Sequence, residues 1–152
     1  MPLNISLKPR ERLVVNGAVI RNKSARHPLT IELLNKVNFM REREILMPED
    51  ALTPLLRVMY WLQITYIDPD QRDDAQLRFL ELVREIKDAV SEPSILSAVD
   101  AAVAFVGQDQ FGSALKALRD ALPHERRLLG MNSEASTSVV AAMRNSVADA
   151  RA

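Results

Sequence analysis

Lysine and arginine side chains gather near two points of the first 47 residues. The candidates for contact with a negatively charged partner are Lys8, Arg10, Lys36, Arg41 and Arg43. On an extended strand, Arg41 and Arg43 would point to the same face, because side chains alternate along a strand. A guanidinium can donate two parallel hydrogen bonds to one phosphate. These residue types at this spacing predict contacts with a nucleic-acid backbone.

The charge of the chain is divided between its parts, although the total is zero. Residues 1–47 carry nine Lys and Arg against four Asp and Glu, whereas residues 48–130 carry nine against fourteen. This asymmetry favours a segment that faces a polyanion, joined to one that repels it. Basic residues also protect exposed strand edges, and Glu42 and Glu44 could neutralise the cations through cross-strand pairs. The sequence leaves both interpretations open.

Residues that an enzyme or a metal site would need are sparse. There is no cysteine, and the two histidines, His27 and His124, are far apart. No glycine-rich phosphate loop occurs. The acidic cluster at residues 68–74 lacks the glycine and final glutamate of a calcium loop, and helix capping explains it better. We therefore expect no catalytic residue, no metal, no cofactor and no enzymatic activity.

Aromatic side chains are concentrated in one stretch with helical spacing: Tyr60, Trp61 and Tyr66. Aromatic residues with a polar tip are common both in cores and at contacts between proteins. We take these three as a candidate partner interface, with a place in the core as the alternative.

The chain shows no targeting signal. Its N-terminus lacks the charged and apolar regions of a secretory signal, and no apolar run approaches the roughly 20 residues of a membrane helix. We expect a cytoplasmic protein without membrane contact.

The basic residues must be positioned by β structure. Apolar and polar residues alternate along residues 3–8 and 29–33, and Asn16-Gly17 separates two β-branched runs, which is a strong hairpin signal. We predict about four short strands within residues 1–47. So small a sheet needs cover from another element or another chain, and we expect a homodimer or a complex with a small partner.

The apolar period becomes helical near Pro48. We predict helices over residues 49–67, 71–90, 94–106 and 110–122, with Pro123 ending the last helix or kinking the chain. Leu52 is expected on the buried stripe of the first helix, and that of the second is expected to hold Leu77, Leu80, Val83 and Ile86. The fold class is α+β: an antiparallel β module at 1–47, a helical bundle at 48–130, and a tail at 131–152 that is one short helix or disordered.

Two stretches of the N-terminal half carry a family resemblance. Leu7-Lys8-Pro9 with Glu11, followed by Asn16-Gly17-Ala18-Val19, resembles the opening of the FlbT family of flagellin post-transcriptional regulators. Asn35-Lys36 with Arg41-Glu42 and Ile45 is similar to a later element of that family. The resemblance covers about residues 1 to 130.

The resemblance implies a regulator of flagellum biogenesis that acts on the 5′ untranslated region of flagellin mRNA. Such regulators often repress translation or promote mRNA decay, sometimes activate, and work alongside a second small flagellar protein, FlaF. A fainter similarity to the first and last strands of CsrA-type RNA-binding proteins implies RNA contacts at Lys8 and Arg41. The alternative is an adaptor or chaperone-like partner of FlaF or flagellin that does not touch RNA.

Overall fold

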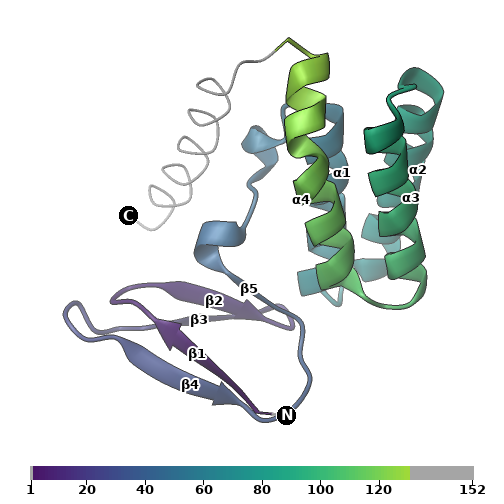
Figure 1. Ribbon diagram of the computed structural model, residues 1–152. Coiled ribbons are helices and arrows are strands. Elements are labelled where there is room, and N and C mark those ends of the chain that lie inside the picture. Colours follow the sequence, from purple (N-terminus) through teal and green to yellow (C-terminus); the bar gives the residue numbers. More distant parts are fainter. Residues whose placement is uncertain (1, 131–152) are drawn as a thin grey trace.

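The computed structural model describes residues 2–130, and the tail prediction for residues 131–152 lies outside this part. Within it the chain forms β1 Leu3–Leu7, β2 Arg12–Val15, β3 Ala18–Arg21, β4 Leu29–Leu33, β5 Phe39–Arg41, the 3-10 helices η1 Glu42–Glu44 and η2 Pro48–Asp50, and the helices α1 Pro54–Ile67, α2 Arg72–Ala89, α3 Pro93–Gly107 and α4 Phe111–Leu128. The strands form a module at one end of the molecule, and the helices pack beyond it (Figure 1). The predicted α+β fold, a small antiparallel β module before a helical bundle, is confirmed.

The β module consists of two small antiparallel sheets. One pairs β1 with β4, and in the other β2 lies between β3 and β5. The predicted hairpin is confirmed, because β2 and β3 pair around Asn16 and Gly17, whose φ angles are +47° and +86°. A two-residue hairpin turn of this type requires positive φ at both positions. A separate small core fills the module, formed by Ile5, Leu7 and Leu13.

Helix α1 begins later than the sequence pattern predicts. We expected it from residue 49, but it starts at Pro54, and Leu52 is 66% exposed. The side chain of Thr53 accepts a hydrogen bond from the Leu56 N–H and so caps the helix. Proline fits the position after a cap because it has no N–H that needs a partner. Residues 48–50 form a separate 3-10 turn.

Helix α2 buries a different face from the one predicted. Leu77 and Leu80 were expected to be buried, but they are exposed, at 62% and 39%. The buried stripe is centred on Phe79 and consists of Ala75, Phe79, Leu82, Val83 and Ile86. The prediction was correct for Val83 and Ile86 and wrong for the two leucines, because a 3.6-residue period fits both stripes and only the position of the neighbouring helix selects one.

Helix α4 continues through Pro123 to Leu128, so the prediction that the proline ends the helix is wrong, while the alternative of a kink at Pro123 stays a prediction. Proline removes one helical hydrogen bond, and a tertiary contact holds the turn beyond it. The buried Glu125 carboxylate accepts a hydrogen bond from the Leu55 N–H, with 2.8 Å between Oε2 and N. Leu55 lies in the first turn of α1, so α4 supplies a cap to α1.

Two side chains of α1 hold the end of the β module against the bundle. The Tyr66 hydroxyl accepts a hydrogen bond from the Phe39 N–H at 3.2 Å. The amide of Gln63 forms two hydrogen bonds with the backbone of Leu46, at 2.7 and 2.8 Å. Both contacts act on residues at or just after β5, and they fix how that segment lies on α1.

Every helix between residues 2 and 130 is too short or too polar to span a lipid bilayer. In the same residues, no three His, Asp or Glu side chains come together as metal ligands would.

A candidate nucleic-acid interface

Two turns of the β module are joined by one buried side chain. Asn22, which follows β3, donates from its Nδ2 to the carbonyl oxygens of Leu7, Lys8 and His27, at 3.3, 3.2 and 2.9 Å. Its Oδ1 accepts a hydrogen bond from the Ser24 N–H at 3.0 Å. The turn between β1 and β2 and the loop between β3 and β4 are therefore fixed to each other.

The backbone adds to this connection. The Arg10 N–H points at the carbonyl oxygens of both Asn22 and Ser24, each at 3.1 Å. Arg10 has a φ of +67°, an uncommon conformation for a residue with a side chain. The Glu11 carboxylate is buried beneath the turn and accepts a hydrogen bond from the Lys8 N–H.

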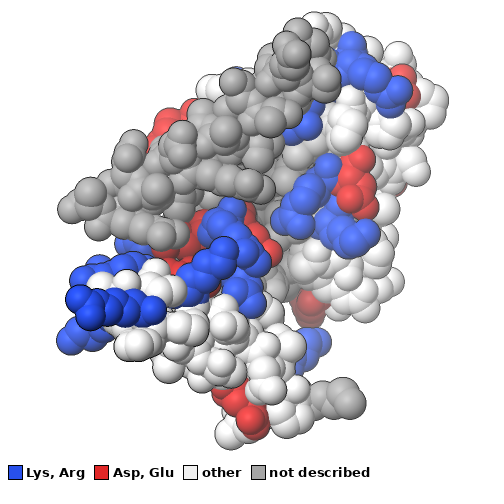
Figure 2. All heavy atoms as spheres, turned by 60° about the vertical axis from the view of Figure 1, so that its left-hand side comes forward, with Lys and Arg blue, Asp and Glu red and all other residues white. Residues whose placement is uncertain are grey.

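The joined turns carry an exposed group of cations, which we call the basic end: Lys8, Arg10, Arg21, Lys23 and Arg26. Both turns lie at the left of the module in Figure 1, and Figure 2, in which that side comes forward, shows Lys and Arg side chains gathered there. Among the described residues, none of these five side chains has an ion pair or a hydrogen bond. The nearby acid, Glu11, is buried.

One cross-strand pair places two cations opposite each other beside the basic end. Arg12 and Arg21 lie directly opposite each other in the register of β2 and β3. Like charges opposite one another destabilise a sheet. Arg12 is neutralised by Glu42, at 2.6 Å between Nη2 and Oε1, whereas Arg21 is left exposed. The contact with Glu42 therefore offsets the like-charge repulsion of this pair and leaves Arg21 as the exposed cation.

The candidate RNA-binding residues fall into different places. Lys8 and Arg10 belong to the basic end. Lys36 lies beyond β4 at the opposite end of the module, because the register pairs Leu33 with Leu3, at the start of β1. The predicted face shared by Arg41 and Arg43 does not exist, since the strand ends at Arg41.

Arg41 is half-buried and bound within the module. Its Nη1 donates to the Ser6 carbonyl oxygen at 2.8 Å and lies 3.6 Å from the Glu11 carboxylate. The sequence left open whether the cations of the β module are ion-paired. Arg41 is paired, with Glu11. Arg43 is exposed and lies on η1, next to a pocket against the helices.

Sequence reasoning missed Arg21, Lys23 and Arg26 as members of the basic end. These residues flank Asn22 in the sequence. Basic residues on both sides of Asn22 were therefore the signal that could have indicated a second group of cations. What the sequence could not give is the bonding of Asn22 to residues 7 and 8, because that depends on how two separate turns meet.

The aromatic candidates for a partner interface are half-buried and largely internal. Tyr66 binds the Phe39 N–H, and burial raises the pKa of its hydroxyl above the usual value of 10.0. Trp61 packs against the main core and contacts Tyr60 edge to face, with 5.3 Å between ring centroids. The residues have contacts within the fold, and a partner would reach only parts of them.

The fold and this surface define a class: a small α+β protein whose β module presents clustered cations and whose helices form a separate core. The chain belongs to the FlbT family, whose model, described as flagellar protein FlbT, matches residues 3–129. The resemblance noted from the sequence is thus confirmed.

Known relatives agree with this membership. The chain is 38% identical over 132 residues to the probable flagellum biosynthesis repressor protein FlbT of Mesorhizobium japonicum, covering 87% of this chain and 88% of the relative. It is 33% identical over 131 residues to the protein of the same description from Brucella anthropi, covering 86% and 84%. No solved structure matches it.

Proposed function

We propose that this protein regulates flagellin expression after transcription, by binding the 5′ untranslated region of flagellin mRNA through the basic end. The observation that carries the proposal is the group of exposed, unpaired cations on two turns joined by Asn22. Relatives described as probable repressors of flagellum biosynthesis support a negative effect, on translation or on mRNA lifetime. The role is one of binding, without catalysis or a cofactor.

The chemistry of the basic end favours contact with the phosphate backbone. Its charged groups are lysine and arginine side chains, and the turns that carry them contain no Phe, Tyr or Trp. Stacking on aromatic rings would therefore contribute little, and affinity would come from displacing counterions. Such binding depends strongly on salt concentration. Specificity for one leader would then come from the shape of its folded RNA.

The test is a titration of fluorescently labelled flagellin leader RNA with the full chain at several salt concentrations. The double variant Lys23→Gln/Arg26→Gln is expected to bind more weakly. It should also flatten the slope of log affinity against log salt by about 0.7 for each phosphate that is no longer neutralised. Lys36→Gln is the matched control for the single variants Lys23→Gln and Arg26→Gln, because it removes one exposed cation from the opposite end of the module.

Two results would contradict the proposal. One is no binding of leader RNA by the folded wild-type protein even at low salt. The other is an equal loss of affinity in Lys36→Gln and in single variants of the basic end, which would indicate non-specific attraction. Absence of RNA binding would favour the second proposal, an adaptor that binds a FlaF-like protein or flagellin directly.

A further inference from the structure

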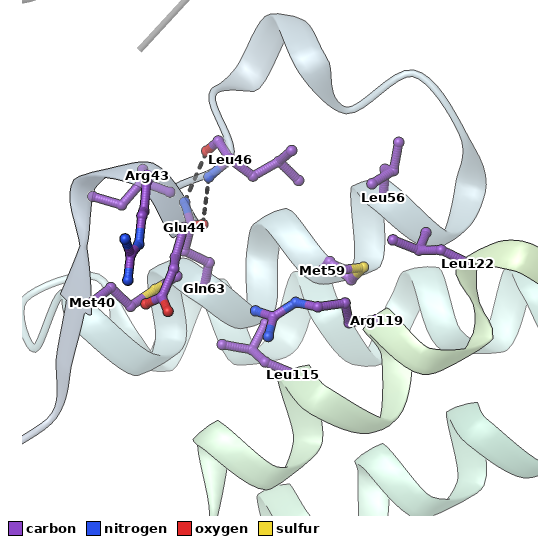
Figure 3. A pocket seen from close by; sticks show the side chains of 11 residues that line it. Met40, Arg43, Glu44, Leu46, Leu56, Met59, Gln63, Leu115, Arg119 and Leu122 are labelled. Carbon is purple, nitrogen blue, oxygen red and sulfur yellow. Dashed lines mark hydrogen bonds between the residues drawn. The ribbon is translucent and has the colours of Figure 1, made fainter. Parts of the chain in front are cut away.

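A pocket of about 380 Å³ lies where the end of the β module meets helices α1 and α4. Its apolar lining comes from three parts of the chain and includes Met40, Leu46, Leu56, Met59, Leu115 and Leu122 (Figure 3). Two of these are methionines, whose flexible side chains adapt to different partners. The pocket and the basic end have no residue in common, although β5, which contributes Met40 to the pocket, pairs with β2 next to one of the turns.

Charged groups stand at the rim of this apolar surface. Arg43 and Glu44 come from η1, and Arg119 comes from α4 on the other side (Figure 3). The Glu44 carboxylate already accepts a hydrogen bond from the Arg41 N–H at 3.3 Å. Within residues 2–130, neither Arg43 nor Arg119 has an ion pair or a hydrogen bond. The rim therefore offers two free guanidiniums.

One wall of the pocket is held in place. Leu46 is fixed to α1 by two hydrogen bonds, which Figure 3 shows as dashed lines: its N–H donates to Gln63 Oε1, and Gln63 Nε2 donates to its carbonyl oxygen. The segment from Met40 to Leu46 contributes to the pocket at both ends. A ligand would thus meet a wall that is already ordered, which lowers the entropic cost of binding.

We propose that this pocket binds a segment of a partner protein: an amphipathic helix that inserts an apolar side chain between carboxylate-bearing residues. The apolar floor fits the anchor, and the two guanidiniums on the rim complement the carboxylates. The phosphates of RNA would bind the guanidiniums, but RNA would leave the apolar floor of the pocket empty. The inference goes beyond RNA binding, since it concerns other residues and another class of partner.

The experiment uses three synthetic helical peptides titrated into the full chain, with binding followed by two-dimensional NMR. The first carries two leucines four residues apart, flanked by glutamates; the second has lysine for each glutamate; the third has alanine for each leucine. The first should bind and shift signals of Met59 and Leu115, and the other two should bind at least about tenfold more weakly.

Charge reversal on the protein then locates the site. The double variant Arg43→Glu/Arg119→Glu should lose affinity for the glutamate peptide by roughly tenfold and gain affinity for the lysine peptide. Arg84→Glu is the matched control, because Arg84 is exposed on α2 and does not line the pocket. Leader-RNA affinity, measured in parallel, should fall equally little in both variants.

Several outcomes would overturn the inference. These are no binding of the glutamate peptide at millimolar concentration, an equal effect of Arg84→Glu, or no exchange of peptide preference in the double variant. A large loss of RNA affinity in the double variant alone would assign the rim to RNA instead.

Since the chain has no cysteine, a spin label can be attached at a single site in the variant Arg119→Cys. Broadened signals from residues 131–152 would then show that the chain's own tail occupies the pocket.

Discussion

The Glu42 carboxylate is buried beside β2 and is bound by Arg12 in three ways. It accepts hydrogen bonds from the Arg12 backbone N–H, Nε and Nη2, at 3.1, 2.8 and 2.6 Å. Its side chain is 3% exposed. The Arg12 side chain is 30% exposed, so water would solvate part of its charge after the loss of Glu42, but three hydrogen bonds to a buried carboxylate would be lost, which costs more than the loss of a surface pair.

We therefore expect Glu42→Ala to lower the free energy of unfolding by about 1–3 kcal/mol. Urea denaturation followed by circular dichroism measures this. Glu32→Ala on β4 is the control, since Glu32 is exposed and should change stability by less than about 0.5 kcal/mol. Similar losses in the two variants would contradict the importance of the Arg12 contact.

Asp50 gives a prediction with a pH dependence. Burial raises the pKa of this carboxyl above its ordinary value of 3.8, and among the described residues its Oδ2 atom has no hydrogen-bond partner. A raised pKa in the folded state means that ionisation opposes folding. The cost is absent below pH 3.8, grows as the pH rises through the folded-state pKa, and is complete above it.

Asp50→Asn should therefore be more stable than the wild type at pH 7, and its advantage should shrink as the pH falls toward 3.8. Thermal unfolding at a series of pH values checks this. An advantage of the variant that is constant with pH would show that ionisation is not the cause.

Arg41 shows why single residues were hard to place from the sequence. It was expected to share a strand face with Arg43 and to contact nucleic acid. In the fold it bridges to Ser6 and Glu11, which are remote in sequence from β5. Its environment is set by the packing of two sheets against each other, and alternation along one strand carries no information about that packing.

At the scale of elements, the start of α1 depends on α4. Glu125→Ala would leave the buried Leu55 N–H without an acceptor, and we expect a loss of about 1–3 kcal/mol. Glu125→Gln keeps an acceptor oxygen but removes the charge that favours a helix N-terminus, so its loss should be smaller. Hydrogen exchange of the Leu55 amide should quicken in the alanine variant. Unchanged exchange would show that the contact is dispensable.

Elements with a local cause could be predicted, and those with a remote cause could not. The hairpin at Asn16-Gly17 follows from two residues that tolerate positive φ. The start of α1 at Pro54 also has a local cause, the Thr53 cap, which the apolar period alone does not reveal. The continuation of α4 past Pro123 coincides with a contact to Leu55, 70 residues away in sequence. No periodicity in α4 itself indicates that contact.

For the whole molecule, the open edges of the two sheets bear on assembly. β3 is an edge strand, exposed at every residue, and Val19 is 64% exposed. β4 is paired on one side and has Leu29 exposed at 42%. Unpaired edges with apolar side chains are sites at which another strand can add.

We expect a homodimer that forms through the β module. Analytical ultracentrifugation should give twice the chain mass for the wild type, and Val19→Lys should give the monomer. Leu77→Lys, on the exposed face of α2, should remain dimeric. A wild-type monomer at high concentration would refute dimerisation, and a monomer produced only by Leu77→Lys would place the interface on the helices.

The bonding of Asn22 has a consequence for how binding at the basic end would be tuned during evolution. The turns are held from beneath by one amide group and the backbone, while the cations extend outward without internal partners. Substitution, gain or loss of one surface cation would therefore leave the backbone of the two turns in place. The affinity of the basic end for a polyanion can thus change in small steps. Asn22 has no such freedom. Aspartate in its place has the same shape but cannot donate to three carbonyl oxygens, so one substitution would leave the connection between the turns to the backbone hydrogen bonds alone.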